Sequence, residues 1–221
     1  MYGLNLNIRS LFIAVLATCL MSQAAAAEGV HTPISGEIEI KFGNYSPQID
    51  SELGGDFSPY NDTFGSDGAL YFESELDFYI WREMGALAVG LSAGYSSNEG
   101  FGFNADGSTS IDETSLSFVP LRFSLVYRAD MFSRLFQVPL VPYVKGGLDY
   151  YLWWIKSAGG IATYRDPADG QIDEARGGTW GWHTAAGLQF LLDSLAPRMS
   201  RSLDVSSGIN NSYIFAEWLK A

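Results

Sequence analysis

Residues 69–97 decide the fold, and they read ALYFESELDFYIW, REMG and ALAVGLSAGYSS in succession. In the first of these segments, apolar residues alternate with mostly acidic ones: Leu70, Phe72, Leu76, Phe78 and Ile80 against Tyr71, Glu73, Glu75, Asp77 and Tyr79. Side chains of a strand point to opposite faces in turn, so this alternation predicts a strand with one apolar and one acidic face. After the tight turn REMG, larger apolar residues alternate with small ones: Leu87, Val89, Leu91 and Tyr95 against Ala86, Ala88, Gly90, Ser92 and Gly94. The stretch therefore predicts a β-hairpin.

The same plan recurs in five further segments that we predict as strands: residues 36–42, 114–128, 143–155, 179–192 and 212–219. Within 114–128 the apolar parity switches at Pro120, from Leu116 and Phe118 to Leu121 and Phe123. Because proline has no N–H to donate to a ladder, the switch predicts a β-bulge.

The connections differ in length. Three are long, polar and rich in Gly and Asp (45–68, 98–113 and 156–178), and three are shorter (82–85, 129–142 and 193–211). The last two have room for a helical turn, for example DMFSRLF after Asp130. Long loops at one end and shorter turns at the other are typical of outer-membrane barrels. We therefore expect an all-β, antiparallel, up-and-down transmembrane β-barrel, nominally of eight strands.

Alternation alone does not decide which face is outside, because a soluble lipocalin-like barrel also alternates, with its apolar face inward. Three features favour apolar side chains outside. The small residues of 86–94 suit a crowded lumen, aromatic residues such as Trp81, Trp154 and Trp180 gather near strand ends, and the segments reach the length of tilted membrane strands.

With that orientation, no position predicted to face lipid carries a charge, and the charges share the inward parity. Unpaired buried charges are costly, so we expect these side chains to form a structural network across a narrow lumen. In this network the acids of 73–77 are expected to pair with Lys41, Arg122 or Lys145. Glu37 and Glu39 share this parity. The predicted network comprises Lys41, Glu73, Glu75, Asp77, Arg122, Lys145, Asp149 and Glu217. The alternative is the solvated face of a secreted sheet.

The N-terminus has the pattern of a secretory signal. Arg9 precedes the apolar run LFIAVLATCLM, and Ala24 to Ala27 offer a cleavage site before Glu28. This predicts residues 1–27 as a signal peptide and 28–221 as the barrel domain of an outer-membrane protein. A buried helix and a lipoprotein signal ending at Cys19 are the alternatives. Cys19 is the only cysteine, so the exported domain would hold no disulfide and would depend on packing and closure.

The segments PLVPYVKGGLDYYLWW (139–154), AAGLQFLLDSLAP (185–197), SGINNSYIFAEW (207–218) and FGNYSPQID (42–50) resemble a myxobacterial-type family of outer-membrane β-barrel proteins without an assigned role. The resemblance covers most of the chain after the signal and implies a small OmpW- or OmpA-like barrel. Such barrels have an even number of strands. Only seven strands are predicted here. Either the closing C-terminal strand is missing from this sequence, or one strand is not recognised by the alternation of apolar and polar residues.

The sequence offers little chemistry. A net charge of −12 excludes nucleic acid as a partner, and outer-membrane lipid is the expected one. His31 lies near the expected new N-terminus. His183 lacks the serine two residues later that outer-membrane lipid deacylases use, because Ala185 stands there, and the residues show no Asp–His pair of the omptin type.

The loops 45–68 and 98–113 hold five and four acids without a base, and DPADGQIDE (166–174) departs from the EF-hand spacing. We therefore expect solvated loops, with divalent-cation binding by these loops as the alternative. We expect no catalytic residue, cofactor or resident metal. The leading prediction is a non-enzymatic, membrane- or surface-structural role. The alternatives are a narrow channel or carrier for small or hydrophobic molecules and a secreted, soluble, ligand-binding barrel.

Overall fold

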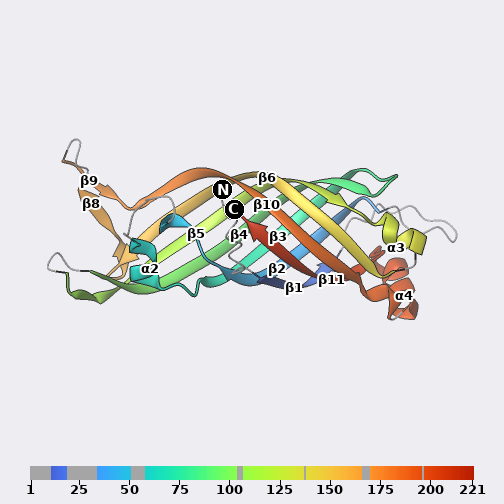
Figure 1. Cartoon of the computed structure of the whole chain (residues 1–221), viewed down its shortest axis with the longest axis horizontal. Coiled ribbons are helices and arrows are strands. Elements are labelled where there is room, and N and C mark those ends of the chain that lie inside the picture. The colour runs from blue at the N-terminus through green and yellow to red at the C-terminus, as the bar shows by residue number, and fades with distance from the viewer. Residues whose placement is uncertain are drawn as a thin grey trace, which may run out of the picture.

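The computed structural model describes residues 11–18, 34–50, 58–103, 107–136, 138–165, 170–195 and 197–221. It is dominated by antiparallel strands that form one long, curled sheet (Figure 1). The main strands are β1 (Leu11–Thr18), β2 (Gly36–Tyr45), β3 (Ala69–Trp81), β4 (Ala86–Phe103), β5 (Thr109–Arg128), β6 (Leu140–Ser157), β10 (Arg176–Leu191) and β11 (Ser212–Lys220). Shorter elements are β7 (Gly160–Ile161), β8 (Thr163–Arg165), β9 (Ile172–Glu174), α2 (Pro59–Phe64), α3 (Met131–Phe136), the 3₁₀ turn Leu192–Ser194 and α4 (Pro197–Ser207).

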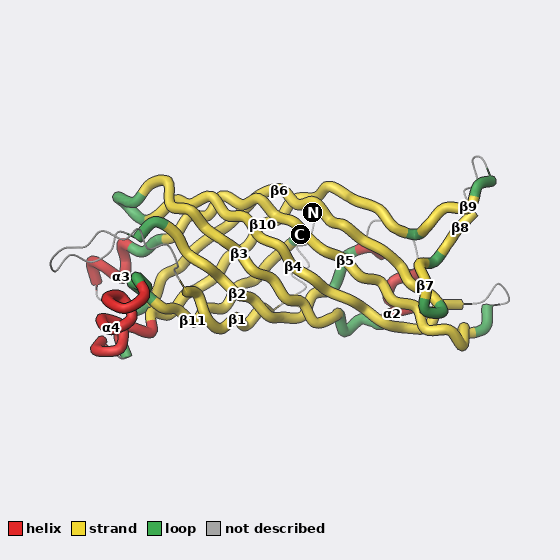
Figure 2. Tube along the Cα trace, turned by 180° about the vertical axis from the view of Figure 1, so that it is seen from behind, coloured by secondary structure: helices red, strands yellow, loops and turns green. Residues whose placement is uncertain are grey.

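Neighbouring strands pair in the order β10, β11, β1, β2, β3, β4, β5 and β6, and β6 also pairs with β10. The sheet therefore curls back on itself around an interior. Helices α3 and α4 lie at one end, with the short turns, whereas α2 and the β8–β9 hairpin lie at the other (Figure 2). None of the helices among the described residues has the length and hydropathy needed to cross a membrane.

The seven predicted strands are all present, and several extend further than the alternation indicated. Two of the three long predicted loops are shortened by strand ends. β4 continues to Phe103 and β5 begins at Thr109, and the loop between β6 and β10 also contains the β8–β9 hairpin. The loop 45–68 keeps its predicted bounds and contains α2. Both intermediate connections contain helix, α3 directly after Asp130 and α4 at Pro197–Ser207. The all-β, antiparallel prediction is confirmed at this level.

The predicted β-bulge at Pro120 is wrong. The β5–β6 register runs without a shift from Leu116↔Ile155 through Pro120↔Tyr151 to Leu121↔Tyr150. Leu116 and Phe118 are therefore on the inner face and are buried. The apolar parity changes because the content of the interior changes: near this end aromatic rings fill it, and Phe118 stacks on Tyr45 at 5.3 Å.

The position of the expected closing strand is occupied by an N-terminal segment. β1 lies between β11 and β2 and pairs antiparallel with both, for example Leu11↔Trp218 and Phe12↔Gly43. The alternation pattern does not reveal this strand, because LFIAVLAT is apolar at nearly every position and matches the core of an export signal. The predicted cleavage site, Cys19 and His31 lie outside the described residues.

Exposure is inverted relative to a water-soluble sheet. Along β3 the acids Glu73, Glu75 and Asp77 are 1–2% exposed, whereas Leu76 on the opposite face is 43% exposed. Outward-pointing apolar residues of the same kind line the other strands, among them Phe72, Phe78, Leu91, Phe123, Leu125, Val144, Leu148 and Trp182. The interior is polar and charged, and the outside of the curl is apolar.

Candidate functional site

The interior of the curled sheet holds a network of buried ionisable side chains. They come from β2, β3, β5, β6, β10 and β11, and each is at most 5% exposed. Seven are carboxylates, four are lysines or arginines, and one is a histidine: Glu37, Glu39, Glu73, Glu75, Asp77, Asp149, Glu217, Lys41, Arg122, Arg128, Lys145 and His183.

Two lysines form the centre of the network. Lys41 Nζ lies 2.8 Å from Glu73 and 2.6 Å from Glu75, and it reaches Glu217 on β11 at 3.1 Å. Lys145 Nζ lies 2.5 Å from Glu39 Oε2 and 2.8 Å from Glu75 Oε2. Glu75 thus bridges both ammonium groups, and side chains from β2, β3, β6 and β11 meet at one point.

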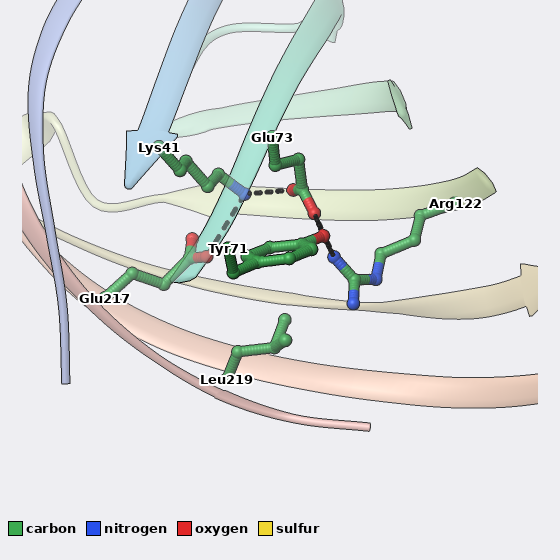
Figure 3. Close-up of a pocket in the computed structure, with 6 residues that line it drawn as sticks. All are labelled: Lys41, Tyr71, Glu73, Arg122, Glu217 and Leu219. Atoms are coloured by element: carbon green, nitrogen blue, oxygen red, sulfur yellow. Dashed lines mark hydrogen bonds and ion pairs between the residues drawn. The ribbon is translucent and has the colours of Figure 1, made fainter. Parts of the chain in front are cut away.

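Arg122 organises the region of the network nearer the long loops. Its guanidinium is ion-paired to Glu73 and donates to the hydroxyl of Tyr71 at 2.5 Å. Its Nε lies 3.5 Å from Asp149 Oδ2. Figure 3 shows Tyr71 between Glu73 and Arg122, with Lys41 on the other side of the carboxylate. A Cβ on Gly94 would lie 2.5 Å from the Tyr71 hydroxyl oxygen, so the small residue at 94 makes room for this ring.

Arg128 occupies the other end, near the short turns. It is ion-paired to Glu37, donates to Tyr79 and Gln189, and lies over the ring of Tyr213 at 4.9 Å. The Gln189 amide donates in turn to Glu37 Oε1 at 3.0 Å and Glu39 Oε1 at 3.3 Å. This cluster closes the interior beside the turns.

The structure brings together all eight residues of the predicted network and adds Glu37, Glu39, Arg128, Gln189 and His183 to it. Arg128 is the last residue of β5, and its parity matches that of Arg122, which is the signal that could have identified it. Gln189 carries no charge, and only its position on the inner face of β10 could have identified it as a member of the network.

A hydrogen-bonded chain of three residues was missed entirely. His183 Nδ1 lies 2.5 Å from Asp149 Oδ1, and His183 Nε2 lies 3.0 Å from the hydroxyl of Ser124. These contacts match those of a Ser–His–Asp triad, which orients a histidine to accept the serine proton. All three side chains are nevertheless at most 2% exposed, and Ser124 lies inside a strand that is paired on both sides. The two hydrogen bonds link β5, β6 and β10 through the His183 ring.

Side chains fill the interior around the Arg122 and Lys41 ion pairs. The gap between Lys41, Tyr71, Glu73, Arg122, Glu217 and Leu219 has no room for a water molecule (Figure 3). The curl is therefore closed by side chains at this level, as expected for a barrel of few strands.

Two groups outside the long strands have shifted pKa values. Burial raises the pKa of Tyr60 in α2 to about 12, and its hydroxyl has no partner among the described residues. Asp50 accepts the backbone N–H of Tyr60 at 2.8 Å. Burial also raises the pKa of Asp193, while the N–H of Ser212, 3.2 Å from Oδ1, opposes that rise.

The acidic loops show no convergent ligand set where the chain is described. Of the segment DPADGQIDE, residues 166–169 lie outside the described ranges, and Asp173 and Glu174 are exposed in β9. Glu174 pairs with Arg176 at 2.6 Å.

Comparison of the chain with protein-family models, with curated proteins and with solved structures finds no match. The resemblance to myxobacterial-type outer-membrane barrels stays a prediction, and any function must be argued from the geometry.

Proposed function

We propose that this protein is an outer-membrane β-barrel with a non-enzymatic, structural role in the membrane. The observation that carries the proposal is the inverted exposure of the strands. Large apolar side chains cover the outside of the curl, while seven carboxylates and four basic side chains are enclosed. In water this arrangement would expose a large apolar surface and bury charges, both of which cost free energy. In lipid the apolar face is solvated by acyl chains.

The dimensions fit a bilayer. Leu70 and Ile80 mark the ends of the outward apolar row on β3. Ten residue steps along a strand tilted by about 40° span about 25 Å, which is the height of the apolar band of outer-membrane barrels. Exposed aromatic residues stand near both edges of this band, with Trp81 and Tyr127 at the turn end and Tyr95 and Trp180 at the loop end. This distribution supports interfacial girdles.

The outward charges of the long strands are confined to strand ends among the described residues. Four of them lie at the loop end, beyond the apolar band: Glu99, Glu113, Lys156 and Arg176. The fifth, Lys220, ends β11 and pairs in register with Thr184. A lysine at the bilayer midplane would cost about 2–4 kcal/mol, and its long stem lets the ammonium move toward a polar region. We therefore expect Lys220 to be the least favourable outward residue of β11.

The filled interior favours a structural role over the channel alternative. A channel needs a continuous water-filled path, whereas Lys41, Lys145 and Arg122 are held in multiple ion pairs across the curl. The secreted, soluble alternative requires the apolar faces of the strands to point inward, whereas here they point outward.

Export through a signal of residues 1–27 belongs to this proposal, and it has a direct consequence. Cleavage after Ala27 would remove the segment that forms β1. Intact-mass analysis of the protein extracted from outer membranes tests this point. A mass starting at Glu28 supports the signal, and a chain that retains Leu11–Thr18 contradicts it.

Two experiments test the membrane role itself. Detergent-extracted protein should migrate differently on gels before and after boiling, because a folded barrel resists detergent unless heated. Reconstituted in planar bilayers, it should give no steady single-channel current. Solubility in detergent-free buffer would overturn the membrane proposal, and a reproducible conductance would replace the structural role with the channel.

A further inference from the structure

The buried network carries more negative than positive charge. Among the described residues, seven enclosed carboxylates face two lysines and two arginines, which leaves an excess of three negative charges when all of these groups are ionised. Enclosed charges without counter-charges are strongly unfavourable. An additional positive species in the interior would remove this cost.

In the described part of the chain, the carboxylate of the network that lacks a basic partner is Asp77. Every other carboxylate of the network has a basic side chain within ion-pair distance: Glu37, Glu39, Glu73, Glu75, Asp149 and Glu217. Asp77 has none among the described residues, although it is only 2% exposed, and the side chain that contacts its carboxyl there is another acid, Glu75. Glu75 Oε1, one inward position away on β3, is also buried and unpartnered within the described ranges.

Asp77 points into a group of carboxylates whose spacing fits a cation. One oxygen each of Glu37, Glu39 and Asp77 lie within 4.8 Å of one another. Glu37 pairs directly with Asp77 in the β2–β3 register, and Glu39 is the next inward residue of β2. Two oxygens bound to one calcium ion at about 2.4 Å are at most about 4.8 Å apart, so the spacing of the three oxygens meets the pairwise condition for sharing one ion.

The facing residue of β4 has no side chain, and the Asp77 and Glu75 carboxylates occupy the volume that a side chain there would take. Gly90 pairs with Asp77 in register, and a Cβ on Gly90 would lie 2.5 Å from Asp77 Oδ1 and 2.7 Å from Glu75 Oε1. The Oε2 atoms of Glu37 and Glu39 are engaged by Tyr79 and Arg128 and by Lys145, respectively. Each Oε1 accepts from Gln189, and because a carboxylate oxygen has two lone pairs, each Oε1 keeps one for a further contact.

We propose that Glu37, Glu39 and Asp77 bind one divalent cation of the calcium type inside the curled sheet, next to the short-turn end. All three ligands are hard oxygen donors, which select calcium or magnesium over softer metals. Glu37 and Glu39 also take part in ion pairs, so their oxygens are not free to adopt a regular octahedron. Calcium, which has longer bonds and accepts irregular geometry, is therefore favoured over magnesium. The site depends on the buried network and is independent of where the protein resides.

The test compares three proteins refolded in detergent: the wild type, Asp77→Asn, and Asp112→Asn as a control that makes the same change at an exposed position near the start of β5. Each is refolded with EDTA, calcium or magnesium, and the thermal midpoint and the bound metal per chain are measured. The wild type and Asp112→Asn should bind one calcium, with a midpoint raised by about 5 °C or more at saturation. Magnesium should give a smaller rise.

Asp77→Asn should lose both the bound calcium and the rise, while remaining at least as stable as the wild type in EDTA because it removes an unpaired charge. Gly90→Ala provides a second variant that narrows the space and keeps every carboxylate, and it should weaken calcium binding. The proposal is overturned if the wild type binds no metal, in which case protons alone offset the excess charge. It is also overturned if Asp77→Asn keeps the same calcium shift, which would assign binding to another region of the chain.

Discussion

Replacing Leu76 by arginine tests the outward face of the sheet where lipid and water differ most. Leu76 lies near the middle of the outward row of β3, in register with Ile38 on β2 and Leu91 on β4. At this depth an arginine facing lipid should cost about 2–4 kcal/mol of unfolding free energy. On a water-exposed sheet the same change loses only cross-strand contacts, worth about 1 kcal/mol or less.

Leu70→Arg is the matched control, because Leu70 lies on the same face of the same strand but near the loop end and is 76% exposed. Close to the interface an arginine costs only about 0–1 kcal/mol. Urea titrations of both variants and the wild type, folded into phospholipid vesicles and followed by tryptophan fluorescence, give the two losses. Equal losses for Leu76→Arg and Leu70→Arg would refute the assignment of this face to lipid.

Three further tests address other regions of the molecule. Lys41→Met should destabilise the fold by about 3–5 kcal/mol in urea titrations, because it leaves several carboxylates uncompensated, and adding Glu217→Gln should recover some of the loss. Tyr60→Phe should leave the unfolding free energy within about 1 kcal/mol of wild type, because the Tyr60 hydroxyl is unpartnered among the described residues. Tyr71→Phe should lower the unfolding free energy by about 1–3 kcal/mol, because it removes a hydroxyl bonded to the buried network. Equal effects of the two substitutions would contradict this expectation. Burial raises the pKa of Asp193, so the folded state holds that proton more tightly than the unfolded state, and stability should fall as pH rises from the ordinary value of 3.8 through the raised one. Asp193→Asn should flatten that segment of the pH–stability curve, and an unchanged curve would show that Asp193 does not contribute to it.

Period-two alternation was sufficient for seven of the main strands and for most of their faces, but not for β1. It depends only on the geometry of an extended chain, so Glu73, Glu75 and Asp77 could be assigned to one side without knowing the fold. The same reasoning failed at Pro120, where it assumed that an inner face stays polar along its whole length. Phe118 is inside because Tyr45 and Tyr151 form an aromatic layer there, and that layer depends on contacts between strands far apart in the sequence.

Partner choice within the network, beyond the pairing of the β3 acids with Lys41, Arg122 or Lys145, could not be predicted for the same reason. The contact of Lys145 with Glu39 joins β6 to β2, and the chain formed by Ser124, Asp149 and His183 joins β5, β6 and β10. These contacts depend on how far each strand is staggered as the sheet curls, and alternation contains no information on stagger. Sequence reasoning therefore identified the charged residues and the basic partners of Glu73 and Glu75. It also paired Asp77 with one of these bases, and the structure shows no ion pair of Asp77 among the described residues.

The seam between β2 and β11 shows why the network matters to the fold. Both strands run away from the end that holds α4, and β1 lies antiparallel between them. Removal of β1 with a signal peptide would leave two parallel edges that must pair with each other or accept another antiparallel strand, since open edges are not tolerated in lipid. Lys41 on β2 nevertheless contacts Glu217 on β11 at 3.1 Å, across the position of β1. This ion pair lies inside the curl, so it links the two strands through side chains and does not depend on the backbone ladder of β1. The buried charges therefore stabilise the region of the sheet where hydrogen-bonded closure is most easily lost.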